Sequence, residues 1–292
     1  KKKKKIIIPS AKTKKLVFDM EKEFRCVTPG NGIRAGQFGG WNFSTEENFQ
    51  FSNLGTNLLA LSRIVDKCGD GNTFVDLGVD YGVSSLCLTY DAIERHNQVY
   101  GVDTQFKRTG FDLWEFPNYH MIQGDSSSVG KNWDTDEFGK VKLLFVDSIH
   151  VAAQVATELY HWYPHMEDDS WIVFHDTNWP AGMHDLGWHP KVQESGIKWD
   201  RPEKAVGLFF DITELFERHG NEGFRYEDEY IRVRHRPESW GLTSVHIKKK
   251  KDYASNIDAE DWNKIFEDRN EVLSYFQKEP DAFLIEDIRN DE

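Results

Sequence analysis

Acidic and histidine side chains stand at the ends of successive apolar runs that are typical of β-strands. These strand-end residues are Asp76, Asp103, Asp125, Asp147, His150, His175 and Asp176. Helix capping explains any single aspartate, because Asp is a good N-cap, but an acidic residue at five strand ends in succession favours a binding site. In open parallel sheets, ligands bind beyond the carboxyl ends of the strands. The spacing therefore predicts one polar site, rich in carboxylates and imidazoles, at one edge of a sheet.

The stretch from Asn72 to Ser85, NTFVDLGVDYGVSS, contains the first of these strand ends. Its apolar run leads into a turn with glycines at Gly78 and Gly82, and two serines then open an apolar helical pattern from Leu86 onward. A strand, a glycine turn and a helix start present backbone N–H groups to a small polar ligand. The other predicted elements are arranged around this stretch.

The order of the elements predicts an α/β protein with a doubly wound, mainly parallel sheet of seven strands. The predicted strands are 74–77, 98–102, 119–123, 141–146, 171–175, 224–233 and 242–247, and the predicted helices are 53–67, 84–96, 151–163 and 202–219. Strands separated by helices imply right-handed crossovers, which place the strands side by side in one direction. The sheet is therefore expected to be Rossmann-like.

The two ends of the chain differ from this central part, and we predict three segments. Residues 1–52 form a Lys-rich tail followed by a Gly-rich loop, which is either a lid over a pocket or a plain connector. Residues 53–250 form the main domain. Residues 251–292 are acidic and amphipathic, which predicts a helical extension that docks on its own domain or on a partner, the first being favoured.

Composition limits the partners and the compartment. The chain has 292 residues, with 36 Lys and Arg against 49 Asp and Glu, a net charge of −13. This acidic balance argues against nucleic acid as a partner, so a small molecule or glycan is expected. The sequence has no apolar run of the roughly 18 to 20 residues that span a bilayer, so no membrane partner is expected. Three separate cysteines without a CxxC pair suit a cytoplasmic protein.

Two properties stay open at this level. One is the oligomeric state, with a homo-oligomer among the alternatives. The other is whether the chain, which starts with Lys rather than Met, is a processed or excised part of a longer one.

The string VDLGVDYGVSS resembles the first motif of class I S-adenosylmethionine-dependent methyltransferases, D/E-x-G-x-x-x-G-x-S, rather than the G-x-G-x-x-G of dinucleotide dehydrogenases. VYGVDT, one crossover later, resembles their second motif. FVDSIH and AATELYHWYPHMEDDSWIVFHDT resemble a narrower group, the sugar and antibiotic O-methyltransferases related to macrocin O-methyltransferase and the so-called cephalosporin hydroxylase proteins. By element order the resemblance covers Leu54 to Ile247, and it implies a Rossmann-like methyltransferase fold.

The resemblance implies a set of residues for S-adenosylmethionine. These are Asp76, Gly78, Gly82, Ser84, Asp103, Asp125 and Ser126. In this family the turn after the first strand contacts the amino-acid part of the cofactor, so Gly78 and Gly82 would allow close backbone approach and Ser84 would donate near the carboxylate. Asp103 matches the acidic residue that accepts hydrogen bonds from the ribose hydroxyls, and Asp125 begins the region that borders the adenine ring.

The resemblance also implies a metal site. Metal-dependent members use an acidic residue after the fourth strand and adjacent side chains after the fifth. Asp147 and Asp176 match that pattern, whereas His175 stands where an acidic residue is often found. Asp147, His175 and Asp176 with water would suit Mg²⁺ or Mn²⁺, or a softer ion if His175 binds directly. His150, with Asp147, is the candidate catalytic pair, His150 being either a general base or a residue that caps the next helix or orients Asp147.

The predicted function is that of an S-adenosylmethionine-dependent O-methyltransferase acting on a hydroxyl of a sugar or glycan with a divalent metal. The alternatives are an O-methyltransferase of a catechol-like or antibiotic-like small molecule, and a binding module that kept the cofactor fold without chemistry. Non-haem iron oxygenases also use His and carboxylate ligands, but their antiparallel barrels do not fit alternating strands and helices. In the loop after Asp176, Trp179, His184, Trp188 and His189 either line the substrate pocket or anchor the loop.

Overall fold

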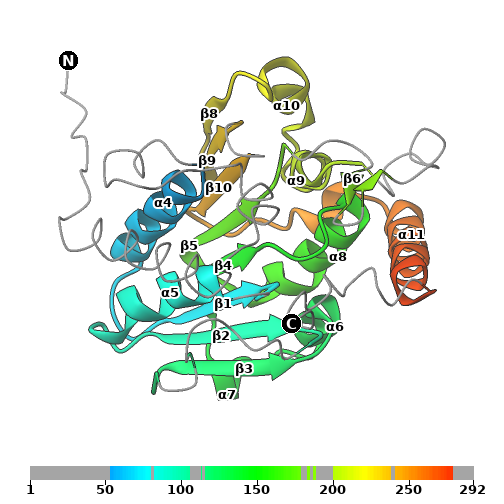
Figure 1. Cartoon of the computed structure of the whole chain (residues 1–292). Coiled ribbons are helices and arrows are strands. Elements are labelled where there is room, and N and C mark those ends of the chain that lie inside the picture. Colours follow the sequence, from blue (N-terminus) through cyan, green and yellow to red (C-terminus); the bar gives the residue numbers. More distant parts are fainter. Residues whose placement is uncertain are drawn as a thin grey trace, which may run out of the picture.

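The computed structural model describes residues 53–79, 82–105, 113, 116–178, 183–184, 187–188, 200–237 and 241–278. These residues form an α/β fold built on one central sheet, with helices on both of its faces (Figure 1). The predicted tail and lid loop, 1–52, and the last part of the C-terminal extension, 279–292, lie outside the described residues. No helix within the described ranges is both long and apolar enough to cross a membrane.

The central sheet has eight strands in the order β3-β2-β1-β4-β5-β10-β9-β8. They are β1 (Thr73–Leu77), β2 (Gln98–Asp103), β3 (Tyr119–Gln123), β4 (Val141–Val146), β5 (Met166–His175), β8 (Phe224–Glu227), β9 (Ile231–Arg236) and β10 (Leu242–Ile247). Strands β1 to β5 are parallel, and the pairs β5–β10, β10–β9 and β9–β8 are antiparallel. The chain leaves β1 toward β2 on one side and later returns to β4 on the other, so the strand order reverses between β1 and β4. The doubly wound, mainly parallel sheet is confirmed.

Both faces of the central strands are buried, which explains why most of their residues are apolar. All residues of β1 and β4 are buried. Phe74 joins the hydrophobic cluster under α4 (Asn53–Cys68) and α5 (Val83–Ile93), whereas the next residue, Val75, joins the cluster under α8 (Ala152–Trp162) and α9 (Pro202–Phe210). Side chains alternate between the faces of a strand, so a strand covered by helices on both sides is apolar at most positions. The buried polar exceptions in β1 and β4 are Thr73, Asp76 and Lys142.

Two predicted elements are divided in the structure. The helix expected over 202–219 is two helices, α9 and α10 (Thr213–His219), because Asp211 ends α9 in the left-handed conformation with φ 57°. The strand expected over 224–233 is the hairpin β8–β9, whose turn is held by Asp228 Oδ1 accepting from the N–H groups of Tyr230 and Ile231, both at 2.7 Å. The hairpin gives the sheet eight strands in place of the predicted seven. The short helices α6 (Ser126–Lys131) and α7 (Thr135–Phe138) were not predicted.

The predicted helical extension is present as α11 (Ala259–Lys278), which packs along α8 (Figure 1). Trp262, Ile265 and Val272 are buried on one face of this helix. The ring of Trp262 lies 4.6 Å from that of Tyr160 on α8. The described part of the extension therefore docks on its own domain, as expected for an amphipathic helix. The three domain boundaries stay predictions.

Candidate functional site

The register of the sheet places the ends of the parallel strands in one row. Leu77 pairs with Val146, and Val146 pairs with Phe174, so the next residues, Gly78, Asp147 and His175, lie side by side. The N–H of Asp147 donates to the carbonyl of Leu77 at 2.9 Å and continues the β1–β4 ladder by one residue. The predicted strand-end residues thus reach the same edge because the strands are parallel and in step.

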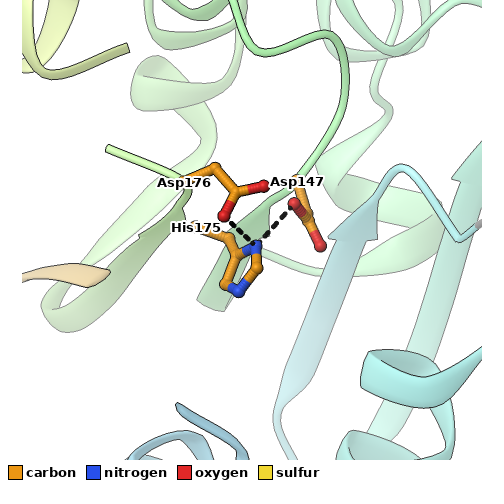
Figure 2. Close-up of side chains that lie close together, drawn as sticks. All are labelled: Asp147, His175 and Asp176. Carbon is orange, nitrogen blue, oxygen red and sulfur yellow. Dashed lines mark hydrogen bonds and ion pairs between the residues drawn. The ribbon is translucent and has the colours of Figure 1, made fainter. Parts of the chain in front are cut away.

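Asp147, His175 and Asp176 form a compact cluster at this edge (Figure 2). Each offers one ligand atom, and these atoms lie within 4.8 Å of one another. The Nδ1 atom of His175 is 3.0 Å from Oδ1 of Asp147 and 3.1 Å from Oδ1 of Asp176, as the dashed lines in Figure 2 show. The structure therefore brings together all three predicted metal ligands, in an arrangement of two carboxylates around one imidazole nitrogen.

The charges of this cluster are strongly coupled. Burial disfavours the charged form of His175, but the carboxylates of Asp147 and Asp176 outweigh it and hold the pKa of His175 well above its usual value. Burial likewise favours neutral Asp147, and the rings of His175 and His150 instead hold the pKa of Asp147 below its usual range. A positive ring between two carboxylates occupies the kind of position that a divalent cation can take.

His150 is the fourth member of the cluster. Its Nε2 lies 3.2 Å from Oδ1 of Asp147 and 3.3 Å from Oδ2 of Asp176. This ring nitrogen faces both carboxylates, so the contact with Asp147 supports the orienting role that was one of the two alternatives. The role of general base stays a prediction.

Asn57 on α4 contacts His175 from the other side of the ring, and sequence reasoning missed it. Its Nδ2 lies 3.2 Å from Nε2 of His175, across 118 positions of the chain. A side-chain amide can present either its oxygen or its nitrogen. Asn57 can therefore accept from a protonated Nε2 of His175 or donate to an unprotonated one. One feature of the sequence could have revealed Asn57: it is a polar residue within the apolar pattern of a helix that was predicted to pack on the sheet. In the structure its side chain is buried.

Asp76 is buried next to the predicted cofactor turn. Its Oδ2 accepts hydrogen bonds from the hydroxyls of Ser84 at 2.9 Å and Ser85 at 2.6 Å. Burial raises the pKa of Asp76 to about 7, although the two hydroxyls act to lower it. The Oδ1 atom is buried and has no hydrogen-bond partner among the described residues. Ser84 thus donates to Asp76, so a hydrogen bond from Ser84 to a cofactor carboxylate would require this hydroxyl to change partner.

The two predicted glycines adopt backbone conformations that suit a glycine turn. Gly78 has φ 88°, and Gly82, the N-cap of α5, has φ 85°. A Cβ atom at Gly78 would overlap the carbonyl oxygen of Asp147 and lie 2.9 Å from Cα of Ser148. Gly78 is therefore required for the close approach of the ends of β1 and β4, and its predicted contact with the cofactor stays a prediction.

Asp103 and Asp125 occupy the ends of the next two strands. Oδ1 of Asp103 accepts from the N–H of Gln105 at 3.0 Å in a tight turn after β2. Asp125 is the N-cap of α6, where its Oδ2 accepts from the N–H of Ser128 at 2.8 Å. Both carboxylates reach the predicted edge, and Asp125 also has the capping role that a strand-end aspartate can have without any ligand.

Ser126, which was predicted to lie with Asp125 in the region that borders the adenine ring, is the first residue of α6. It is buried, and its hydroxyl donates to Oε1 of Glu158 on α8 and accepts from Nε2 of Gln154 at 3.0 Å. Its side chain therefore belongs to a network between α6 and α8, and the place of Ser126 in the region that borders the adenine ring stays a prediction.

The predicted substrate loop is described only in part. Trp179 and His189 lie outside the described residues, and His184 and Trp188 lie on the short antiparallel pair β6 (Met183–His184) and β7 (Gly187–Trp188). The structure describes no side-chain contacts for these four residues, so their roles stay predictions.

A comparison with protein families gives a match to the central part of the chain. Residues 75–177 match the family model described as a methyltransferase domain. This segment runs from β1 to the end of β5 and contains every predicted cofactor, metal and catalytic residue. The resemblance inferred from the sequence motifs is confirmed at this level. The narrower relationship to the macrocin O-methyltransferase group stays a prediction.

Solved structures give distant likenesses, and no curated protein matches the chain. PaMTH1, a methyltransferase of Podospora anserina solved with SAH, is 13% identical, with a TM-score of 0.48, over 84% of this chain and 100% of that one. MycE, a methyltransferase of the mycinamycin pathway solved with Mg and SAH, is 15% identical, with a TM-score of 0.43, over 76% and 61%. CalS11, a TDP-rhamnose 3'-O-methyltransferase of calicheamicin biosynthesis, is 11% identical, with a TM-score of 0.42, over 82% and 96%.

Proposed function

We propose that this protein is an S-adenosylmethionine-dependent O-methyltransferase that acts on a hydroxyl of a sugar or glycan with the help of a divalent metal ion. The observation that carries the proposal is the cluster of Asp147, His175 and Asp176 beside the β1–α5 turn, inside the segment that matches a methyltransferase domain. The sugar as acceptor rests on the sequence resemblance.

The residues around the β1–α5 turn fit a cofactor with an amino-acid group. Gly82 is the N-cap of the eleven-residue helix α5, whose first N–H groups have no partner within the helix. The buried Oδ1 of Asp76 lacks a hydrogen-bond partner among the described residues, as expected of an acceptor kept for a ligand donor. Asp103 ends the neighbouring strand, where its carboxylate can accept from ribose hydroxyls.

The cluster fits a divalent metal by its donor chemistry. Asp147 and Asp176 supply the carboxylate oxygens that Mg²⁺ and Mn²⁺ prefer, and His175 supplies a nitrogen that suits Mn²⁺ better than Mg²⁺. When bound, such an ion lowers the pKa of a hydroxyl that it contacts. The same two carboxylates raise the pKa of His175 and so favour a positive ring between them when no cation is bound.

His150 is the residue that we propose to accept a proton. In methyl transfer to an alcohol, the acceptor oxygen would gain a C–O bond as the methyl–sulfur bond of the sulfonium breaks and leaves its electron pair on the sulfur of S-adenosylhomocysteine. The oxygen must also lose its O–H proton. Nε2 of His150 lies within hydrogen-bond distance of Asp147 and Asp176, so these carboxylates orient its ring. Asp147 contributes by fixing both histidine rings of the cluster.

Binding and transfer assays test the proposal directly. Purified protein should bind S-adenosylhomocysteine, the demethylated product, in calorimetry. With methyl-labelled S-adenosylmethionine and a panel of sugars, glycosides and catechols, label should enter a sugar product in the presence of Mg²⁺ or Mn²⁺ and not in excess chelator. A protein that binds neither form of the cofactor would refute the proposal.

A pair of matched substitutions tests the metal site. Asp176→Asn should abolish metal-dependent transfer, while Asp169→Asn should retain it. Asp169 is a suitable control because it also has a positive φ and pairs with a histidine, His246, at 2.7 Å, but away from the cluster. Transfer that persists in Asp176→Asn or in excess chelator would exclude the metal.

The remaining outcomes identify the alternatives. Label in a catechol but in no sugar would move the acceptor to the non-sugar class. Cofactor binding without turnover across the panel would indicate a binding module. Oxygen uptake that depends on 2-oxoglutarate would indicate an oxygenase.

A further inference from the structure

One side chain of the C-terminal helix, Arg269, reaches the end of β3. Its Nη2 forms an ion pair with Oδ1 of Asp125, and its Nε donates to Oε1 of Gln154 at 3.0 Å. The Arg269 side chain is only 11% exposed. Helix α11, alongside α8 in Figure 1, lies outside the segment 75–177 that matches a methyltransferase domain, so this contact joins a region without an assigned role to the sheet edge.

Arg269 fixes the orientation of Asp125. One oxygen of this carboxylate accepts from the N–H of Ser128 and caps α6, and the other is paired with the guanidinium. Arginine has a planar fork of donors, so it can hold the Asp125 carboxylate and the Gln154 amide at once, which the single ammonium of lysine does less well.

The contacts of Gln154 extend this arrangement toward the metal cluster. Gln154 Nε2 donates to Ser126 Oγ at 3.0 Å and to Glu158 Oε1 at 2.9 Å. Ser148 Oγ donates to the same Glu158 oxygen at 2.6 Å, and Ser148 directly follows Asp147. Glu158 is fully buried. A continuous set of hydrogen bonds therefore runs from α11 through α8 to the residue next to a predicted metal ligand.

We propose that Arg269 is a positioning residue for cofactor binding, so that α11 is a working part of the site. The inference rests on the proposed function and on the sequence resemblance, which implies that Asp125 borders the adenine ring of S-adenosylmethionine. Arg269 acts through Asp125 and Gln154. The buried residues Trp262, Ile265 and Val272 anchor α11 on their own, so a change at position 269 should leave the helix in place.

Substitution of Arg269 separates this role from a general effect on folding. Arg269→Gln removes the charge and the fork of donors but keeps a polar amide. We expect about tenfold weaker binding of S-adenosylhomocysteine and about tenfold faster hydrogen exchange of the amides at 126–131, with Mn²⁺ affinity within about twofold of the parent. Arg269→Lys, which keeps the charge, should recover part of both losses.

The control is Arg218→Gln on α10, where Arg218 pairs with Glu214 at 3.2 Å on an exposed surface. This variant removes the same charge and should match the parent in cofactor binding, exchange and Mn²⁺ affinity.

Cofactor binding and hydrogen exchange, measured together, keep the inference distinct from the proposed function. If the parent binds no S-adenosylhomocysteine, the proposed function fails and the cofactor role of Arg269 fails with it, while exchange at 126–131 still decides whether Arg269 holds Asp125. If the parent binds but Arg269→Gln binds equally well, the inference alone is overturned, whatever the exchange shows. Equal losses of cofactor and Mn²⁺ affinity would also overturn it, because they would indicate general disruption.

Discussion

The buried carboxyl group of Asp76 should make the stability of the protein fall as pH rises toward neutrality. Its pKa is raised from 3.8 to about 7, first by burial. The folded state therefore binds this proton more tightly than the unfolded state does. Its contribution to stability is fully present below about pH 4, declines as pH rises, and is lost above about pH 7.

The size of this effect follows from the shift of about three pKa units. Each unit corresponds to about 1.4 kcal/mol, so the ionised form costs about 4 kcal/mol of folding free energy. Asp76 is fully buried, so solvent does not screen this charge. Asp76→Asn removes the charge with little change of shape, and its amide oxygen can still accept from Ser84 and Ser85.

Urea unfolding at several pH values between 4 and 8, followed by tryptophan fluorescence, measures the effect. The stability of Asp76→Asn minus that of the parent should increase by about 4 kcal/mol from pH 4 to pH 8. Other titrating groups cancel in this difference because both proteins contain them. Ser85→Ala, which removes a donor that lowers the pKa of Asp76, should extend the decline to higher pH. Parallel stability curves for Asp76→Asn and the parent would refute the reasoning.

Two further substitutions test the packing around the site. Gly78→Ala should destabilise the fold by about 2 kcal/mol or more in urea unfolding and should weaken Mn²⁺ binding. The reason is that the new Cβ would overlap the carbonyl of Asp147, at a residue with a positive φ. Unchanged stability and unchanged Mn²⁺ affinity would contradict the close approach of β1 and β4. Trp262→Ala should lower the free energy of unfolding, measured in the same way, by about 3 to 5 kcal/mol, because it opens a cavity between α11 and α8. A loss below about 1 kcal/mol would show that Trp262 does not anchor α11 there.

Elements with a strong local signal were predicted closely from the sequence. The predicted bounds of β3, β4 and β10 agree with the structure, because turn-forming or charged residues flank each of these segments. The two elements that are divided in the structure were each predicted as one, because backbone turns at single residues leave no mark in an apolar pattern. Asp211 ends α9 with a left-handed backbone conformation, and Asp228 accepts the hydrogen bonds that close the turn between β8 and β9. Neither residue interrupts the apolar pattern that predicted one longer element.

In the site, too, some features follow from the sequence and others only from the tertiary structure. The sequence by itself determined the strand ends and the types of residue on them, because parallel strands that finish on acids and histidines must present them at one edge. Only the tertiary structure decided that His175 lies between Asp147 and Asp176, and that Asn57 and Arg269 complete the surroundings of the site. Asn57 contacts a residue 118 positions away, and Arg269 one 144 positions away. Periodicity records how a segment packs, but the partner of a polar side chain depends on how distant segments meet.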